Sequence, residues 1–74
     1  MLTATIEQPS DATAFLFDAI NAAAEANNLD EAEAYLRQRF SRSRIYRVER
    51  ETPETVAVRH DCFRRRVVAR VGAD

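Results

Sequence analysis

Residues 45–59, IYRVERETPETVAVR, decide the fold, because apolar and polar side chains alternate on both sides of a turn at residues 52–54. A period of two is typical of a strand with one buried face. A proline-containing turn between two such segments predicts an antiparallel hairpin. The apolar positions are Tyr46 and Val48 before the turn and Val56 and Val58 after it.

A third strand is predicted downstream of a second turn near residues 60–62. There Val67, Ala69 and Val71 alternate with Arg66, Val68 and Arg70. Arg65 would fall on the apolar face, which predicts a strand end or a bulge beside it. Residues 43–72 therefore predict an Arg-rich β-meander.

Two helices are predicted ahead of the meander. Residues 10–40 read as an acidic helical hairpin, with a first helix over about residues 11–26 whose apolar arc is centred on Leu16. Asn27-Asn28 ends that helix, since asparagine tolerates the left-handed cap conformation. Asp30 then starts the second helix and forms a capping box with Glu33.

A short first strand completes the element order. Leu2, Ala4 and Ile6 alternate with polar residues, so a strand is expected within residues 1–8 and would join an edge of the sheet. The chain of 74 residues is expected to form one domain over residues 1–74. Its fold class is α+β in the order βααβββ, with the helical hairpin on one face of a small antiparallel sheet of three or four strands. A core this small would be completed readily by a homodimer or a bound partner.

The charges are sharply segregated along the chain. Residues 1–36 contain seven acids and no base, whereas residues 37–74 contain eleven arginines and five acids, so the net charge of −1 conceals halves of −7 and +6. Such a field steers association with other molecules and performs no chemistry by itself. All basic residues are arginine, which is typical of a GC-rich coding bias or of selection for bidentate contacts.

The sequence offers one cluster with catalytic residue types, His60-Asp61-Cys62. A Cys–His pair can make an activated thiolate, but catalysis would also need an orienting group and oxyanion donors, and the sequence shows neither. One histidine and one cysteine also leave a metal site without enough ligands. We therefore expect turn residues here, no enzyme activity, and neither a cofactor nor a metal.

The leading hypothesis is a non-enzymatic protein that binds a macromolecular partner through charge complementarity. The acidic helices would dock on a protein with a basic surface, and Phe17 or Phe15 would anchor the contact beside the acids. Small size and composition suit a phage or mobile-element accessory protein. One such role is to block a host nucleic-acid-binding machine, as anti-CRISPR inhibitors do. The predicted partner-binding residues are Asp11, Phe17, Asp18, Glu25, Asp30, Glu31 and Glu33.

The alternative is a nucleic-acid-binding regulator that uses an arginine-rich sheet face. If the apolar strand positions face the helices, five arginines would point outward together and hold phosphates. Ion pairs with Glu49 or Asp61 are the simpler interpretation of the same face. The arginines concerned are Arg47, Arg59, Arg64, Arg66 and Arg70.

The compartment is predicted from two observations. Cys62 is the single cysteine, so no internal disulfide can form, which favours a reducing cytoplasm. The longest apolar stretch, residues 15–26, is interrupted by polar side chains and is too short to cross a membrane. We therefore expect a cytoplasmic protein with no membrane contact.

Overall fold

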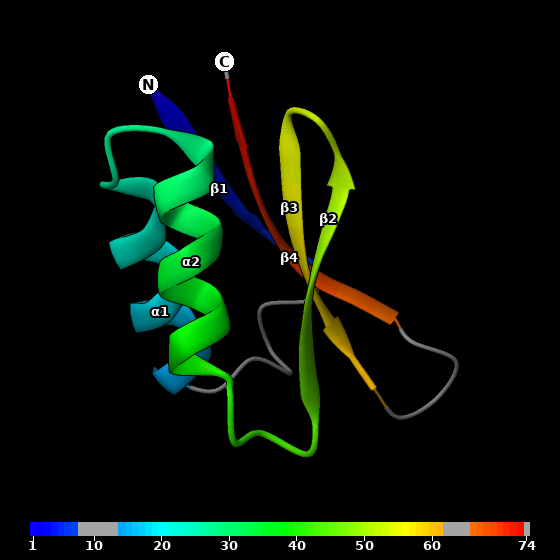
Figure 1. The fold of residues 1–74 in the computed structure, drawn as a ribbon. Helices are drawn as coiled ribbons and strands as arrows, with labels where there is room; N and C mark the ends of the chain where they lie inside the picture. The colour runs from blue at the N-terminus through cyan, green and yellow to red at the C-terminus, as the bar shows by residue number, and fades with distance from the viewer. Residues whose placement is uncertain (8–13, 62–65, 74) are drawn as a thin grey trace.

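The computed structural model of the protein describes residues 1–7, 14–61 and 66–73 and has an α+β fold in the predicted order βααβββ (Figure 1). The two helices and the sheet lie side by side, and both helices cover the same face of the sheet. The elements are β1 (Leu2–Ile6), α1 (Ala14–Ala24), α2 (Leu29–Arg39), β2 (Tyr46–Thr52), β3 (Thr55–His60) and β4 (Arg66–Ala73).

The sheet has four antiparallel strands in the order β1-β4-β3-β2. The meander supplies β2, β3 and β4. As predicted, β1 joins an edge of the sheet, and the structure shows that this edge is β4. Leu2 pairs with Ala73, so the two ends of the chain lie together at one end of the sheet (Figure 1).

The core lies between the helical hairpin and the sheet. Each helix contributes one apolar stripe, centred on Leu16 and Ile20 in α1 and on Leu36 in α2. The strands contribute the alternating inward positions that the sequence predicts in β2 and β3. The buried cluster consists of Leu16, Ala19, Ile20, Ala23, Leu29, Ala32, Leu36, Phe40, Val56, Val58, Ala69 and Val71.

The start of α2 differs from the predicted capping box. Helix α2 begins at Leu29, and the side chain of Asn28 accepts a hydrogen bond of 2.8 Å from the Glu31 backbone N–H. Asn28 has the extended backbone that an N-cap residue requires (φ −151°, ψ 170°). The capping box from Asp30 to Glu33 is therefore wrong, and both carboxylates are left available for contacts with the sheet.

A bulge in the pairing of β3 with β4 makes part of the predicted facing of β4 wrong. Val58 pairs with Ala69 but Arg59 pairs with Val67, so Val68 is the extra residue. One inserted residue exchanges the two faces of the strand beyond it. Val68 therefore packs against the core, and Val67 lies opposite Arg59 on the outer face, the reverse of the prediction.

Candidate interaction surfaces

The outer face of the sheet, which the helices leave uncovered, carries an ion-pair network. We use this name for Glu7, Glu49, Glu51, Arg59 and Arg70. The Nε of Arg59 lies 2.8 Å from Glu49, and its second guanidinium nitrogen lies 2.8 Å from Glu51. Arg70 is bound to Glu51 at 2.9 Å and to Glu7 at 2.8 Å. In acid–base alternation, the network thus ties β2, β3 and β4 to one another and to Glu7, the residue after β1.

Glu51 is the centre of the network, because it bonds arginines from two different strands. Arg70 grips both of its carboxylate oxygens, at 2.9 and 3.3 Å. Arg70, followed by Arg59, holds the pKa of Glu51 below its ordinary value. Beneath these side chains Ala57 is fully buried although it is not part of the core cluster. The network therefore acts as the cover of the outer face.

The arginines predicted to bind nucleic acid are mostly engaged by these acids. Arg47, Arg59 and Arg70 do point to the outer face, but Arg47 pairs with Asp61 at 3.0 Å and the other two belong to the network. Arg66 lies opposite His60, off the line of Arg59 and Arg70, because the bulge intervenes. This placement corrects the prediction of one outward arginine row. Arg64 lies outside the described residues.

Arg50 connects the sheet to the helical hairpin, a contact that the sequence interpretation missed. One guanidinium nitrogen lies 2.8 Å from Asp30 and 2.7 Å from Glu33. The same side chain donates to the carbonyls of Thr52 and Pro53 at 3.2 and 2.8 Å, within and beyond β2. The period of two in β2 indicated this contact, because residue 50 follows positions 46 and 48 on the side of the strand that faces the helices.

Two of the predicted partner-binding acids are therefore internal contacts. Glu33 lies between Arg50 and Arg37, the latter at 2.8 Å, and Arg50 is the main cause of its lowered pKa. Asp30 pairs with Arg50 while its side chain stays 88% exposed. Both carboxylates help to fix α2 against the sheet.

The remaining predicted acids form an acidic surface on the helical hairpin, which we define as Asp18, Glu25 and Glu31. All three are exposed, and none makes an ion pair with another residue that the structure describes. Asp18 lies on the solvent side of α1, and Glu25 and Glu31 lie around the connection to α2. Asp11 lies outside the described residues.

Of the two phenylalanines predicted as anchors, Phe15 is the more exposed. Phe15 is 43% exposed, whereas Phe17 is partly buried. Phe15 makes an edge contact with Phe40, with the two ring centroids 5.3 Å apart. The guanidinium carbon of Arg39 lies 4.4 Å from the centroid of the Phe15 ring. A cation over the face of an aromatic ring is held by the ring quadrupole. Phe15 thus stands where the acidic α1 face meets an arginine-rich segment.

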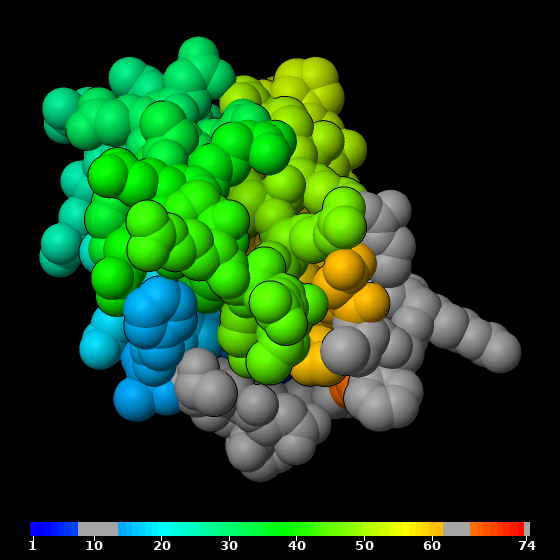
Figure 2. Space-filling view, turned by 60° about the horizontal axis from the view of Figure 1, so that its bottom comes forward, coloured from blue at the N-terminus to red at the C-terminus, as the bar shows by residue number. Residues whose placement is uncertain are grey.

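That segment, which we call the arginine loop, comprises residues 40–45, which join α2 to β2, together with Arg39, the last residue of α2. It carries Arg39, Arg42 and Arg44 and no acid. Figure 2 shows the start of α1, the loop and the end of β3 meeting at this end of the molecule. Neither Arg42 nor Arg44 makes an ion pair within residues 1–7, 14–61 and 66–73. The loop is therefore the free cationic part of the described surface.

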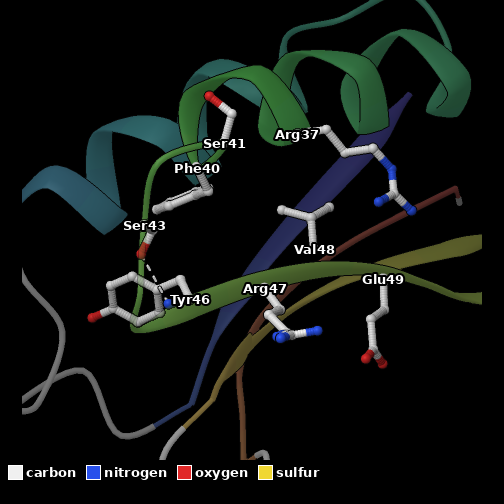
Figure 3. A pocket seen from close by; sticks show the side chains of 8 residues that line it. All are labelled: Arg37, Phe40, Ser41, Ser43, Tyr46, Arg47, Val48 and Glu49. Atoms are coloured by element: carbon white, nitrogen blue, oxygen red, sulfur yellow. Dashed lines mark hydrogen bonds between the residues drawn. The ribbon is translucent and has the colours of Figure 1, made fainter.

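A shallow groove of about 360 Å³ lies beside the loop, between the end of α2 and β2 (Figure 3). Val48 points toward α2, whereas Arg47 and Glu49 point away to the outer face. Phe40 lies at the end nearest the loop and makes an edge contact of 5.5 Å with Tyr46. The lining residues are thus chemically mixed, and two of the three charged ones point away from the groove.

Two residues of the His60-Asp61-Cys62 cluster lie at the end of β3 and just beyond it. His60 ends β3 and makes an edge contact of 5.7 Å with Tyr46, and Asp61 binds Arg47. Cys62 lies outside the described residues. In the part of the chain that the structure describes, no three metal-ligating side chains come together, and no helix has the length and apolar character to cross a membrane.

Comparisons with known proteins add no family. No protein-family model, curated protein or solved structure matches the chain. The function must therefore be argued from the two unpaired charged surfaces.

Proposed function

We propose that this protein is a non-enzymatic interaction protein that binds a macromolecular partner with a basic surface through its acidic surface. The observation that carries the proposal is the unequal use of the acids. Glu33, Glu51 and Asp30 are engaged with arginines of the same chain, whereas Asp18, Glu25 and Glu31 are exposed without such a pair among the described residues.

Phe15 supports the same surface. It is separated from Asp18 by one helical turn, and residues three positions apart lie on one side of a helix. A half-exposed aromatic ring beside unpaired charges is the composition of a binding hot spot, in which the ring supplies buried area and the charges steer the encounter. An inhibitor from a phage or mobile element that occupies the basic channel of a host nucleic-acid-binding machine would use such a surface.

The test is a photo-crosslinker placed at Asn21, an exposed α1 position between Asp18 and Glu25. In the cells that produce the protein, we expect a crosslink to one partner with a basic surface. Asp18→Arg and Glu25→Arg are each expected to abolish that crosslink while leaving the circular dichroism spectrum unchanged, because like charges now oppose each other at the contact.

The matched control is Glu54→Arg, which makes the same charge change at an exposed position in the β2–β3 turn. It is expected to leave the crosslink intact. The proposal fails if the crosslink survives both α1 reversals, or if Glu54→Arg abolishes it equally, since net charge alone would then explain the binding.

A further inference from the structure

The arginine loop contains arginines without a carboxylate partner, unlike most other arginines that the structure describes. Arg37, Arg47, Arg50, Arg59 and Arg70 each bind at least one carboxylate within 3.0 Å. Arg42 and Arg44 are exposed and have no carboxylate partner among the described residues. They present two strong cations to solvent only two positions apart, and an anionic ligand would find them unoccupied.

The backbone of the loop is held in place before any ligand arrives. The hydroxyl of Ser43 accepts hydrogen bonds from the backbone N–H groups of Ile45 and Tyr46, at 3.2 and 2.9 Å, and Figure 3 shows the bond from Tyr46. The hydroxyl of Ser41 donates to the carbonyl of Gln38 at 2.9 Å, at the end of α2. A loop ordered by its own serines loses less conformational entropy on binding than a free one.

Apolar side chains are interleaved with these cations. Phe15, in α1, is 43% exposed, and Ile45, the last residue of the loop, is 47% exposed. The guanidinium of Arg39 already lies over the Phe15 ring, at 4.4 Å. Unstacked bases of a single strand pack on aromatic faces and guanidinium planes, whereas a duplex hides its bases and offers mainly phosphates.

We infer that the arginine loop binds single-stranded nucleic acid, with backbone phosphates at Arg42 and Arg44 and a base against Phe15 and Arg39. This site goes beyond the proposed function: its cations are not part of the acidic surface, although Phe15 lies at the border of both. The neighbouring groove is a poorer phosphate site, because its arginines, Arg37 and Arg47, are bound to acids.

The test is fluorescence anisotropy with labelled oligothymidine and oligouridine of about 12 nucleotides, a length within the usual single-strand site sizes. Binding is measured at about 50 mM and about 200 mM NaCl, where phosphate contacts respond strongly to salt. A duplex of the same length and a polyglutamate peptide serve as the competing ligand classes. Comparison of the two oligonucleotides shows whether the ligand is DNA or RNA.

Arg42→Gln combined with Arg44→Gln is expected to weaken single-strand binding on the order of tenfold at the lower salt. It is also expected to reduce the slope of log affinity against log salt by about 1.4, the value for two lost phosphate contacts on a single strand. Arg37→Gln combined with Arg47→Gln removes the same charge from exposed, acid-paired positions. This matched control is expected to retain the wild-type slope.

Phe15→Ala separates base stacking from simple charge attraction. It is expected to weaken single-strand binding by about 5- to 150-fold, which corresponds to the loss of about 1–3 kcal/mol for one stacked base, while binding of the duplex stays unchanged. In the double variant Asp18→Arg and Glu25→Arg, single-strand binding should still depend on Arg42 and Arg44. This result is therefore independent of whether the proposed function is correct.

The inference is overturned by absence of binding at the lower salt, by an equal loss in the control pair, or by tighter binding of the duplex. It is also overturned if polyglutamate binds as tightly as the single strands and loses affinity with Arg42 and Arg44, because the loop would then be a site for an acidic protein.

Discussion

Replacement of Glu51 by glutamine tests whether the charged sheet face is structural. The substitution keeps the shape of the side chain and removes the charge that binds Arg59 at 2.8 Å and Arg70 at 2.9 Å. The side chains of Glu51, Arg59 and Arg70 are 23%, 21% and 36% exposed, so both pairs lie in the range of partly screened surface ion pairs. We expect a loss of about 1 kcal/mol in the free energy of unfolding.

That loss corresponds to a fall in Tm of about 4–8 °C for a domain of this length. The assay is thermal unfolding followed by circular dichroism, with Glu54→Gln as the control. Glu54 is exposed in the β2–β3 turn, and its side chain makes no ion pair with any residue that the structure describes. Its neutralisation should change stability by less than about 0.5 kcal/mol.

The pH dependence of the difference between wild type and Glu51→Gln gives a second readout. The pKa of Glu51 is lowered in the folded protein, mainly by Arg70, so its carboxylate stabilises the fold above the unfolded pKa of about 4.3. That contribution is lost as the pH falls through the folded pKa. The difference should therefore be full near neutral pH and vanish in acid, and about 1 M NaCl should reduce it. Equal effects of Glu51→Gln and Glu54→Gln, or a difference independent of pH, would refute the reasoning.

Three further predictions concern the helical hairpin. Asn28→Ala removes the N-cap bond to the Glu31 N–H and should cost about 1 kcal/mol in urea unfolding, whereas Asn27→Ala should cost less than about 0.5 kcal/mol. Leu36→Ala empties a fully buried position between the helices and the sheet and should cost about 2–5 kcal/mol, the largest loss of the set. Arg50→Gln removes the main cause of the lowered pKa of Glu33, so a carboxyl NMR titration should show that pKa rising toward its ordinary value. An unchanged Glu33 titration would contradict the contact between α2 and β2.

The element order and the pairing within the meander were predictable because they depend on hydrophobic periodicity and short turns, whereas the edge that β1 joins was not. Alternation in β2 and β3 specified which residues face the helices, and Val56 and Val58 are indeed fully buried. The bulge at Val68 was not predictable, because the sequence can place the extra residue at several points of β4 without changing its composition. Sequence interpretation anticipated irregularity near Arg65, which lies outside the described residues.

The charged surfaces were predictable in composition but not in pairing. Segregation of acids and arginines along the chain suggests two opposed faces, yet antiparallel folding brings Glu7 of the acidic half to 2.8 Å from Arg70 of the basic half. Ion pairs depend on contacts between strands distant in sequence, which a linear charge pattern does not contain. Arg50 is the exception, since its place in the alternation already put it under the acidic helix.

The central claim is that folding divides the arginines into a paired structural set and a free set in the arginine loop. The most direct measurement is the exchange rate of the arginine Nε–H protons with water, followed by ¹⁵N NMR. The Nε atoms of Arg37, Arg59 and Arg70 donate to carboxylates at 2.8–2.9 Å, so their signals should be protected from exchange. Those of Arg42 and Arg44 should exchange rapidly. Similar exchange rates for all of these arginines would contradict the account.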